Sequence, residues 1–257
     1  MKITVLGSGS AYGVPMIFNT WGSANPDNPK NHRTRASIVI EEKGKSILID
    51  AGPDLRFQIN ATSIKNIDSV LITHGHYDHM MGIPELLRAI KIINHGITVY
   101  ASQETMAEIK NCYGYLFKGD AEGEPESKSL QWQIIPDNGE FEANGLKFET
   151  MQVVHHNLHP SSFRYKNFAY VTDWEQMPEE NIAKLQDLEL LIIECNNGQT
   201  EAINGHSNLV QVKEIVAKIN PQRVILSHLS ARVDADELEK QLPSNFEIAY
   251  DGMEIEI

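Results

Sequence analysis

The chain has 257 residues, of which 41% are hydrophobic and 22% are charged, and its formal net charge is −13. This length and composition suit a folded protein with a core of its own, and the negative charge argues against non-specific binding to nucleic-acid phosphates. Two cysteines far apart in the sequence exclude both a disulfide framework and a cysteine zinc site. No apolar run suits a signal peptide or a membrane span, so we expect one cytoplasmic domain over residues 1–257 with no membrane contact.

The predicted strands are short runs rich in β-branched residues, at 2–7, 36–42, 45–50, 69–74, 97–102, 146–154, 168–173, 188–194, 223–228 and 246–257. Helical spacing of apolar residues predicts helices at 84–96, 102–117, 177–189, 208–220 and 234–242. Strands in bunches, alternating with helices later in the chain, are typical of a layered α/β protein. Two long polar stretches, 19–35 and 118–129, are expected loops, and loops of this length are often functional.

Four of the predicted strands end in a side chain that can bind a metal ion. These side chains are Asp50, His74, Asp173 and His228. Ligand sites in α/β proteins gather where the carboxyl ends of strands meet, so we expect these side chains to converge on one edge.

The run "HGHYDH", which follows an apolar strand directly, concentrates histidines to an unusual degree. In an extended segment His74 and His76 point to the same side, and a turn into a helix near residues 80–84 brings Asp78 and His79 to a neighbouring point. Neutral imidazoles and carboxylates bind zinc, manganese or iron. We therefore predict two adjacent metal positions; the alternative, a solvated polar turn, gives no reason to pack so many imidazoles after a buried strand.

The motif "THGHYDH" resembles the H-x-H-x-D-H signature of the metallo-β-lactamase fold superfamily, which is an αββα sandwich. The stretches "ILIDAGPD", "VTD" and "ILSH" resemble further motifs of that superfamily, and the resemblance covers nearly the whole chain. It implies one metal ion on His74, His76 and His155 and a second on Asp78, His79 and His228. Asp173 and a hydroxide would bridge them, and Asp50 would lie behind, orienting a ligand histidine.

The pair His155 and His156 leaves open which of the two binds metal. The stretch "SFRYKNFAYVTD" is similar to one that follows the ligand histidine in related sequences, and its spacing favours His155. His156 would then be a neighbour behind the ligands, and His159 a solvated loop residue.

Four further stretches, "GSGSAYGVP", "RTRASIVI", "GPDLRFQ" and "GHSN", resemble the branch that contains the PhnP-type cyclic phosphodiesterase, ribonuclease Z and PqqB. The resemblance implies that His206 is a general acid; the alternative is a histidine at the start of a helix that makes a cap-side hydrogen bond. We expect Asp78 to take part in catalysis as well as in metal binding. The guanidinium groups of Arg33, Arg35 and Arg56 are candidate substrate phosphate contacts, with surface salt bridges as the alternative.

The resemblance implies a dinuclear metal-dependent hydrolase, most readily a phosphodiesterase that uses a metal-bridging hydroxide on a small cyclic or nucleotide-like phosphodiester. Two Zn²⁺ or Mn²⁺ ions, or iron, would be its cofactors. No cysteine follows "GVP", so we expect no second, structural zinc site there. The alternatives are a PqqB-like binding, carrier or biosynthetic protein, a ribonuclease Z-like nuclease, for which the acidity is unhelpful, and a diiron redox protein.

Relatives often pair, and a homodimer of this chain would bury Met16, Ile17 and Phe18 in its seam.

Overall fold

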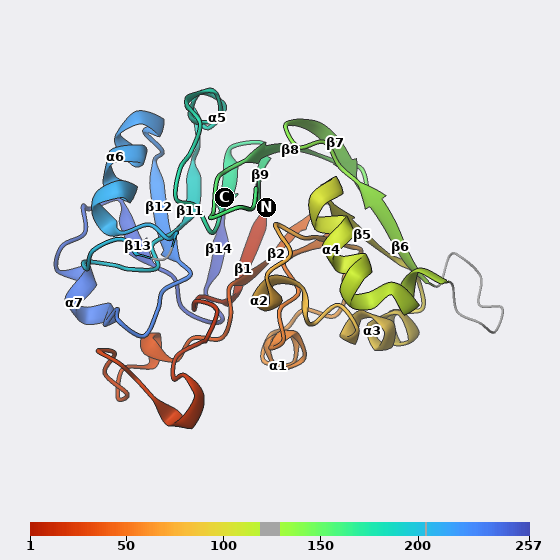
Figure 1. Cartoon of the computed structure of the whole chain (residues 1–257), viewed down its shortest axis with the longest axis horizontal. Coiled ribbons are helices and arrows are strands. Elements are labelled where there is room, and N and C mark those ends of the chain that lie inside the picture. The colour runs from red at the N-terminus through yellow and green to blue at the C-terminus, as the bar shows by residue number, and fades with distance from the viewer. Residues whose placement is uncertain (119–128, 204) are drawn as a thin grey trace.

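Two seven-stranded sheets form the centre of the structure (Figure 1). The computed structural model describes residues 1–118, 129–203 and 205–257, so most of the predicted loop 118–129 lies outside the described residues. The first sheet has the order β14-β1-β2-β3-β4-β5-β6, and the second β13-β12-β11-β10-β9-β8-β7. The strands of the first sheet are β1 (Lys2–Gly7), β2 (Ser37–Glu42), β3 (Lys45–Ile49), β4 (Ser69–Leu71), β5 (Ile97–Ala101), β6 (Leu130–Ile134) and β14 (Glu254–Glu256). Those of the second are β7 (Gly139–Ala143), β8 (Leu146–Gln152), β9 (Ser161–Tyr165), β10 (Phe168–Val171), β11 (Leu190–Glu194), β12 (Arg223–Ser227) and β13 (Phe246–Ile248).

Alternation along the strands explains why the sheets stack. In β3, Ile47 and Ile49 join an inner core cluster that also holds Ile192 of β11, whereas Leu48 and Leu191 point to outer clusters. A strand that is buried on both faces needs apolar residues at every position, which is why these segments read as continuous apolar runs.

Helices cover the outer face of each sheet (Figure 1). The first sheet carries α1 (Leu55–Asn60), α2 (Tyr77–Met80), α3 (Glu85–Ile93) and α4 (Gln103–Tyr113), and the second α5 (Glu179–Ala183), α6 (Leu209–Ile219) and α7 (Ala235–Glu239). Helix α6 begins with a capping box in which the Asn208 side chain accepts from the Gln211 backbone, and it buries Val212 and Val216. The predicted αββα sandwich is confirmed. Within the described residues, every helix is too short or too polar to cross a lipid bilayer.

The structure corrects the predicted elements in several places. The run 246–257 is two strands in different sheets, because a turn with Gly252 at φ +85° separates β13, which pairs with β12, from β14, which pairs with β1. Three strands, β6, β7 and β9, and the helix α1 were not predicted. The helix expected near residues 80–84 begins earlier, at Tyr77.

The strand directions bring the predicted ligands to one edge. Strands β3 and β4 are parallel, and so are β10, β11 and β12, so their carboxyl ends lie together within each sheet. Stacking the sheets then places the two sets of strand ends beside each other, as the shared donor clusters described below confirm.

Candidate metal centre

The structure brings together all seven side chains that the resemblance implies as metal ligands. Their donor atoms form overlapping groups in which every pair lies within 4.8 Å. The first group has donors from His74, His76 and His155; two others are His74, His79, Asp173 and Asp78, His79, His228. These groups share members, so they form a single cluster of nitrogen and oxygen atoms beneath the strand ends.

The chemistry of the cluster fits a divalent cation. The buried Nε2 atoms of His74, His79 and His228 have no hydrogen-bond partner in the described part of the chain. His79 Nε2 nevertheless lies 3.0 Å from an oxygen of Asp173 and 3.1 Å from one of Asp78. Buried polar atoms are normally satisfied, so inward nitrogens beside carboxylate oxygens indicate a place for a metal ion.

A neighbour holds each buried ligand histidine on the side away from the cluster. His79 Nδ1 is 2.8 Å from Asp50, and His74 Nδ1 is 3.0 Å from the Thr73 hydroxyl. In the second sheet, His155 Nδ1 is 2.8 Å from the carbonyl of Gly205, and His228 Nδ1 is 3.1 Å from the amide of Asn196. Such partners fix the ring orientation and the tautomer that leaves Nε2 free for a metal ion.

Asp50 is the predicted residue behind the ligands, and the structure places it there. Its carboxylate is fully buried and accepts hydrogen bonds from both the backbone N–H and the hydroxyl of Thr73. Asp50, Asp173 and His228 all have positive φ values, of 65°, 47° and 56°. These strand ends therefore adopt a left-handed conformation that is rare outside glycine and that is often found at functional sites.

The pKa values of neighbouring histidines in the cluster are shifted in opposite directions. Burial lowers the pKa of His74 well below its usual value, and the neighbouring His79 lowers it further. Burial also lowers the pKa of His79, but Asp78, Asp173 and Asp50 outweigh it and raise this pKa well above its usual value. Protonation would therefore suit His79 but not the neighbouring His74, whereas metal ions can bind the Nε2 atoms of both rings.

The two consecutive histidines after β8 have different surroundings. His155 is 1% exposed and belongs to the donor group with His74 and His76. His156 is exposed, has φ +53°, and lies along the cleft with its ring 4.6 Å from that of His155. The structure thus places His155 in the cluster and His156 beside it. His159 is an exposed residue 3.3 Å from Glu104.

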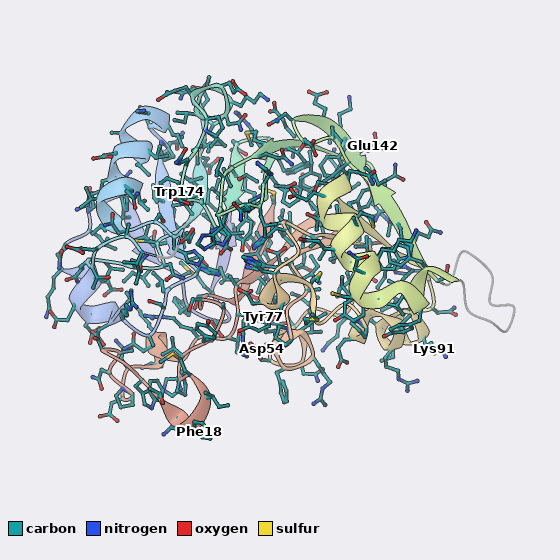
Figure 2. All side chains as sticks on the ribbon, viewed as in Figure 1. Phe18, Asp54, Tyr77, Lys91, Glu142 and Trp174 are labelled. Atoms are coloured by element: carbon teal, nitrogen blue, oxygen red, sulfur yellow. The ribbon has the colours of Figure 1, made fainter. Side chains whose placement is uncertain are left out.

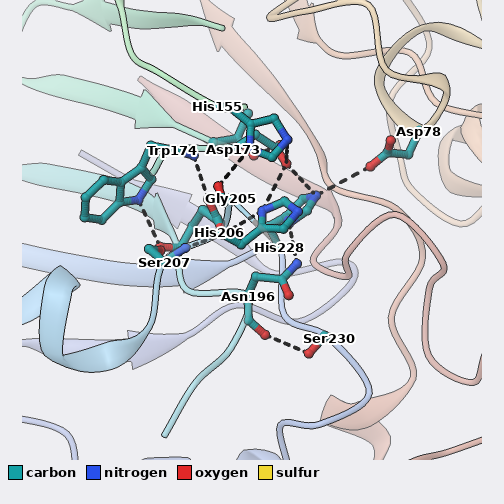
Figure 3. A network of polar contacts seen from close by, with 12 residues as sticks. Asp78, His155, Asp173, Trp174, Asn196, Gly205, His206, Ser207, His228 and Ser230 are labelled. Atoms are coloured by element: carbon teal, nitrogen blue, oxygen red, sulfur yellow. Dashed lines mark hydrogen bonds and ion pairs between the residues drawn. The ribbon is translucent and has the colours of Figure 1, made fainter. Parts of the chain in front are cut away.

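His206 lies against the cluster and is held by a buried glutamate that was not predicted. Its Nδ1 is 3.1 Å from Glu194 and 3.5 Å from Asp173. Figure 3 shows His206 among these side chains, close to Asp173. Glu194 also accepts from the backbone N–H groups of Trp174 and Ser207. Burial lowers the pKa of His206, but the hydrogen bond and charge of Glu194 outweigh it and raise this pKa to about 9. The sequence could have indicated Glu194 as a site residue, because it ends its predicted strand just as Asp50, Asp173 and His228 end theirs.

A cleft of about 760 Å³ opens onto the cluster. Its wall combines cluster residues with Tyr12, Met16, Ile203 and the turn Ser230–Arg232. Among the described residues, Arg232 is the one lysine or arginine that lines it, and its exposed side chain forms no ion pair within that part of the chain.

The three predicted phosphate contacts lie elsewhere. Arg33 is 2% exposed and donates to the carbonyls of Lys30, Ser230 and Val233. This burial gives it a structural role and argues against the expected contact with substrate. Arg35 pairs with Asp54 at 3.0 Å and donates to the carbonyl of Ala11, behind the cleft wall.

The third, Arg56, is exposed and stacks over the ring of Phe57 at 4.6 Å, and it does not line the cleft.

Fold and site together define the class of protein. Residues 45–229 match the model of the beta-lactamase superfamily domain, so the chain belongs to that superfamily, and it is a metal-dependent hydrolase of this fold.

Three proteins of this superfamily fold resemble the chain over most of its length. A crystal structure of a diphosphatase from the PhnP family superimposes with a TM-score of 0.89 at 27% identity, covering 100% of this chain and 97% of that one. The zinc-bound PqqB of Methylobacterium extorquens shares the fold at a TM-score of 0.78 and 18% identity, with 100% of both chains covered. A ribonuclease Z of Clostridium tetani is 25% identical over 81% of this chain and 87% of its own length.

An octanoyltransferase of Porphyromonas gingivalis is 31% identical over 99% of this chain, but the match covers 51% of that protein. The chain therefore spans about half the length of this relative.

Proposed function

We propose that the chain is a phosphodiesterase that binds two divalent metal ions and hydrolyses a small cyclic or nucleotide-like phosphodiester. The proposal rests on the buried Nε2 atoms of His74, His79 and His228, which have no hydrogen-bond partner among the described residues and lie beside the carboxylates of Asp78 and Asp173. His74, His76 and His155 would hold one ion, and Asp78, His79 and His228 the other, with Asp173 between them. Zn²⁺ and Mn²⁺ suit these ligands, as does iron.

The residues divide the chemical work. When bound, two cations lower the pKa of a water molecule and neutralise charge on phosphoryl oxygens. Glu194 orients His206 through Nδ1 and favours its protonated form, so that Nε2 can give a proton to the leaving oxygen. Asp173, beside both His79 and His206, helps to keep these rings aligned. His206 is thus the general acid of the proposal, and Asp78 would act by holding a metal ion.

Substrate size and charge follow from the cleft. Its volume suits a molecule of mononucleotide size. A single lysine or arginine on the described wall of the cleft, in a chain with net charge −13, is a weak platform for a long polyanion. This favours a small phosphodiester over transfer RNA, although the relatives named ribonuclease Z keep nuclease activity as the second candidate.

The match to an octanoyltransferase does not alter this proposal. We assign octanoyl transfer to the half of that protein that this chain does not match, because the matched half is the one that corresponds to the metal cluster. An octanoyl thioester is therefore a control substrate.

The direct test is hydrolysis of bis(p-nitrophenyl) phosphate with added Mn²⁺ or Zn²⁺. The wild-type protein should turn it over, His76→Ala should fall to the background rate, and His159→Ala, which alters an exposed histidine, should keep full activity. Turnover that survives His76→Ala would remove the metal from the mechanism. Faster cleavage of precursor transfer RNA or of the octanoyl thioester would replace the proposed substrate.

A further inference from the structure

The loop after β11 holds a side chain that faces both the metal cluster and the cleft. Asn196 is 8% exposed, and its amide nitrogen Nδ2 is placed 3.1 Å from Nδ1 of His228. The same residue lines the cleft. Figure 3 shows Asn196 and Asp173 approaching His228 from different sides. One end of the amide thus meets a ligand ring, and within the described residues no hydrogen bond holds the other end.

The position of the hydrogen on the His228 ring determines whether the oxygen or the nitrogen of the Asn196 amide faces that ring. His228 Nε2 is the inward atom, 3.5 Å from both Asp78 and Asp173, so it is the nitrogen that faces a metal ion. A neutral imidazole that binds through Nε2 carries its hydrogen on Nδ1, which must then donate. An NH₂ group cannot accept that hydrogen, whereas the amide oxygen can.

The other buried ligand histidines follow the same rule. Asp50 offers a carboxylate to His79, Gly205 offers a carbonyl to His155, and the Thr73 hydroxyl can accept from His74 while it donates to Asp50. Oxygen and nitrogen of an amide are assigned by their hydrogen bonds, so the consistent orientation of Asn196 has Oδ1 on His228.

We propose that Asn196 is a positioning residue with two roles: its Oδ1 accepts the Nδ1 proton of His228, and its NH₂ group faces the cleft and donates to an oxygen of the bound phosphoester. The second role rests on the function proposed above. Both roles follow from a single orientation of the amide, since fixing the oxygen on His228 leaves the two amide hydrogens toward the cleft.

The backbone around Asn196 is rigid enough to hold this orientation. The carbonyl of Asn196 accepts from both the N–H and the hydroxyl of Ser230, which ties the loop to the turn that follows His228. Neighbouring Asn197 donates to the carbonyls of His206 and Ser207. Asn196 is therefore anchored to the segments on either side of the cluster.

Two substitutions separate the roles. Asn196→Asp keeps an acceptor for His228 but replaces the donor with a negative charge. Metal affinity should stay within about threefold of wild type, while KM for bis(p-nitrophenyl) phosphate and the inhibition constant of inorganic phosphate should each rise at least about tenfold. Asn196→Ala removes both groups and should in addition weaken metal binding about 10- to 100-fold. Asn60→Ala, an exposed asparagine at the end of α1, is the matched control and should change neither.

Metal affinity is measured by equilibrium dialysis and elemental analysis, so it reports without turnover. If Asn196→Ala binds metal as tightly as wild type, or Asn196→Asp binds it as weakly as Asn196→Ala, the first role is overturned. If Asn196→Asp leaves KM and phosphate inhibition unchanged, the second is. A wild-type protein that binds phosphate but turns over no phosphodiester would fault the proposed function and leave the first role standing.

A measurement on the unaltered, zinc-loaded protein covers the case in which a variant does not fold. Nitrogen-15 NMR should show a hydrogen on Nδ1 of His228, and the Asn196 NH₂ signals should shift when inorganic phosphate is added. A His228 ring with its hydrogen on Nε2, or amide signals that phosphate does not move, would contradict the proposal.

Discussion

Each of the four buried ligand histidines, His74, His79, His155 and His228, presents Nε2 to the cluster because another residue holds its Nδ1. The partners are chemically different: a buried carboxylate on His79, a hydroxyl on His74, a backbone carbonyl on His155 and an amide on His228. They lie far from their histidines in sequence, except Thr73. These contacts set the geometry of the site as much as the ligands do.

Glu194 is the residue whose removal most directly tests the role of His206. In the metal-free protein His206 should titrate with a pKa of about 9, because the charge and hydrogen bond of Glu194 outweigh the effect of burial. In Glu194→Gln this support is weakened, so the His206 pKa should fall, and kcat should drop about 10- to 100-fold with a smaller change in KM. NMR titration and steady-state kinetics provide the two readouts. An unchanged titration would show that Glu194 does not control His206.

Arg232 is the residue we expect to meet the substrate's charge. Replacing it with alanine removes the one lysine or arginine side chain from the described cleft wall, so KM for bis(p-nitrophenyl) phosphate should rise about tenfold with kcat nearly constant. Arg56→Ala serves as the control, since that side chain is exposed outside the cleft. Equal kinetics for the two variants would exclude Arg232 from substrate binding.

At the scale of elements, the loop between β1 and β2 is a cleft wall anchored by buried polar contacts. Asn31 donates to Asp234 at 2.7 Å and accepts from the N–H of Ala235, which attaches the loop to the start of α7. Arg33 spans the loop and the turn that carries Arg232. The outer end of this loop exposes Ile17 at 78% and Phe18 at 92%. Figure 2 shows Phe18 at the edge of the molecule. A dimer seam over these residues stays a prediction.

Arg33→Ala should therefore destabilise the protein rather than impair substrate binding alone. It removes the side-chain donor to the buried carbonyl of Val233 and one of the two donors to the Asn31 side chain, which costs on the order of 3 kcal/mol in the free energy of unfolding. Arg56→Ala should stay within about 0.5 kcal/mol of wild type. Urea unfolding measures both. Wild-type stability of Arg33→Ala together with a raised KM would restore the phosphate contact that the structure argues against.

The sequence predicted the elements that carry strong patterns and missed those that do not. Continuous apolar runs such as "LLIIE" identified the buried strands. Strands β7 ("GEFEA") and β9 ("SSFRY") mix polar and apolar residues, and Asp54 at the start of α1 forms no side-chain cap, so none of these patterns stood out. The ligands were predictable because most lie in short motifs or at strand ends. The roles of Glu194 and Asn196 and the burial of Arg33 depend on contacts with residues distant in the sequence, which the resemblance did not specify.

At the scale of the whole molecule, the site is shared between the two sheets. The segment that follows β4 of the first sheet supplies His74, His76, Asp78 and His79. The segments that follow strands of the second sheet supply His155, Asp173 and His228. A metal ion that takes ligands from both sheets would therefore link the halves of the sandwich.

Removal of metal should lower the stability of the whole domain. Ligands that bind only the folded state stabilise it by about 4 kcal/mol at a concentration of 1,000 times Kd. Dialysis against a chelator should then lower Tm by roughly 10 °C, and added Zn²⁺ or Mn²⁺ should restore it. In His76→Ala the difference between metal-loaded and metal-free protein should shrink. Identical melting curves with and without metal would show that the sheets are not linked in this way.

The central claim is that strand ends from two sheets enclose a pair of cations, and anomalous diffraction from a crystal of the metal-loaded protein tests it most directly. Data collected on both sides of the zinc and manganese absorption edges should give two peaks, one among His74, His76 and His155 and one among Asp78, His79 and His228. No peak at these residues, or a single peak that does not touch Asp173, would contradict the account.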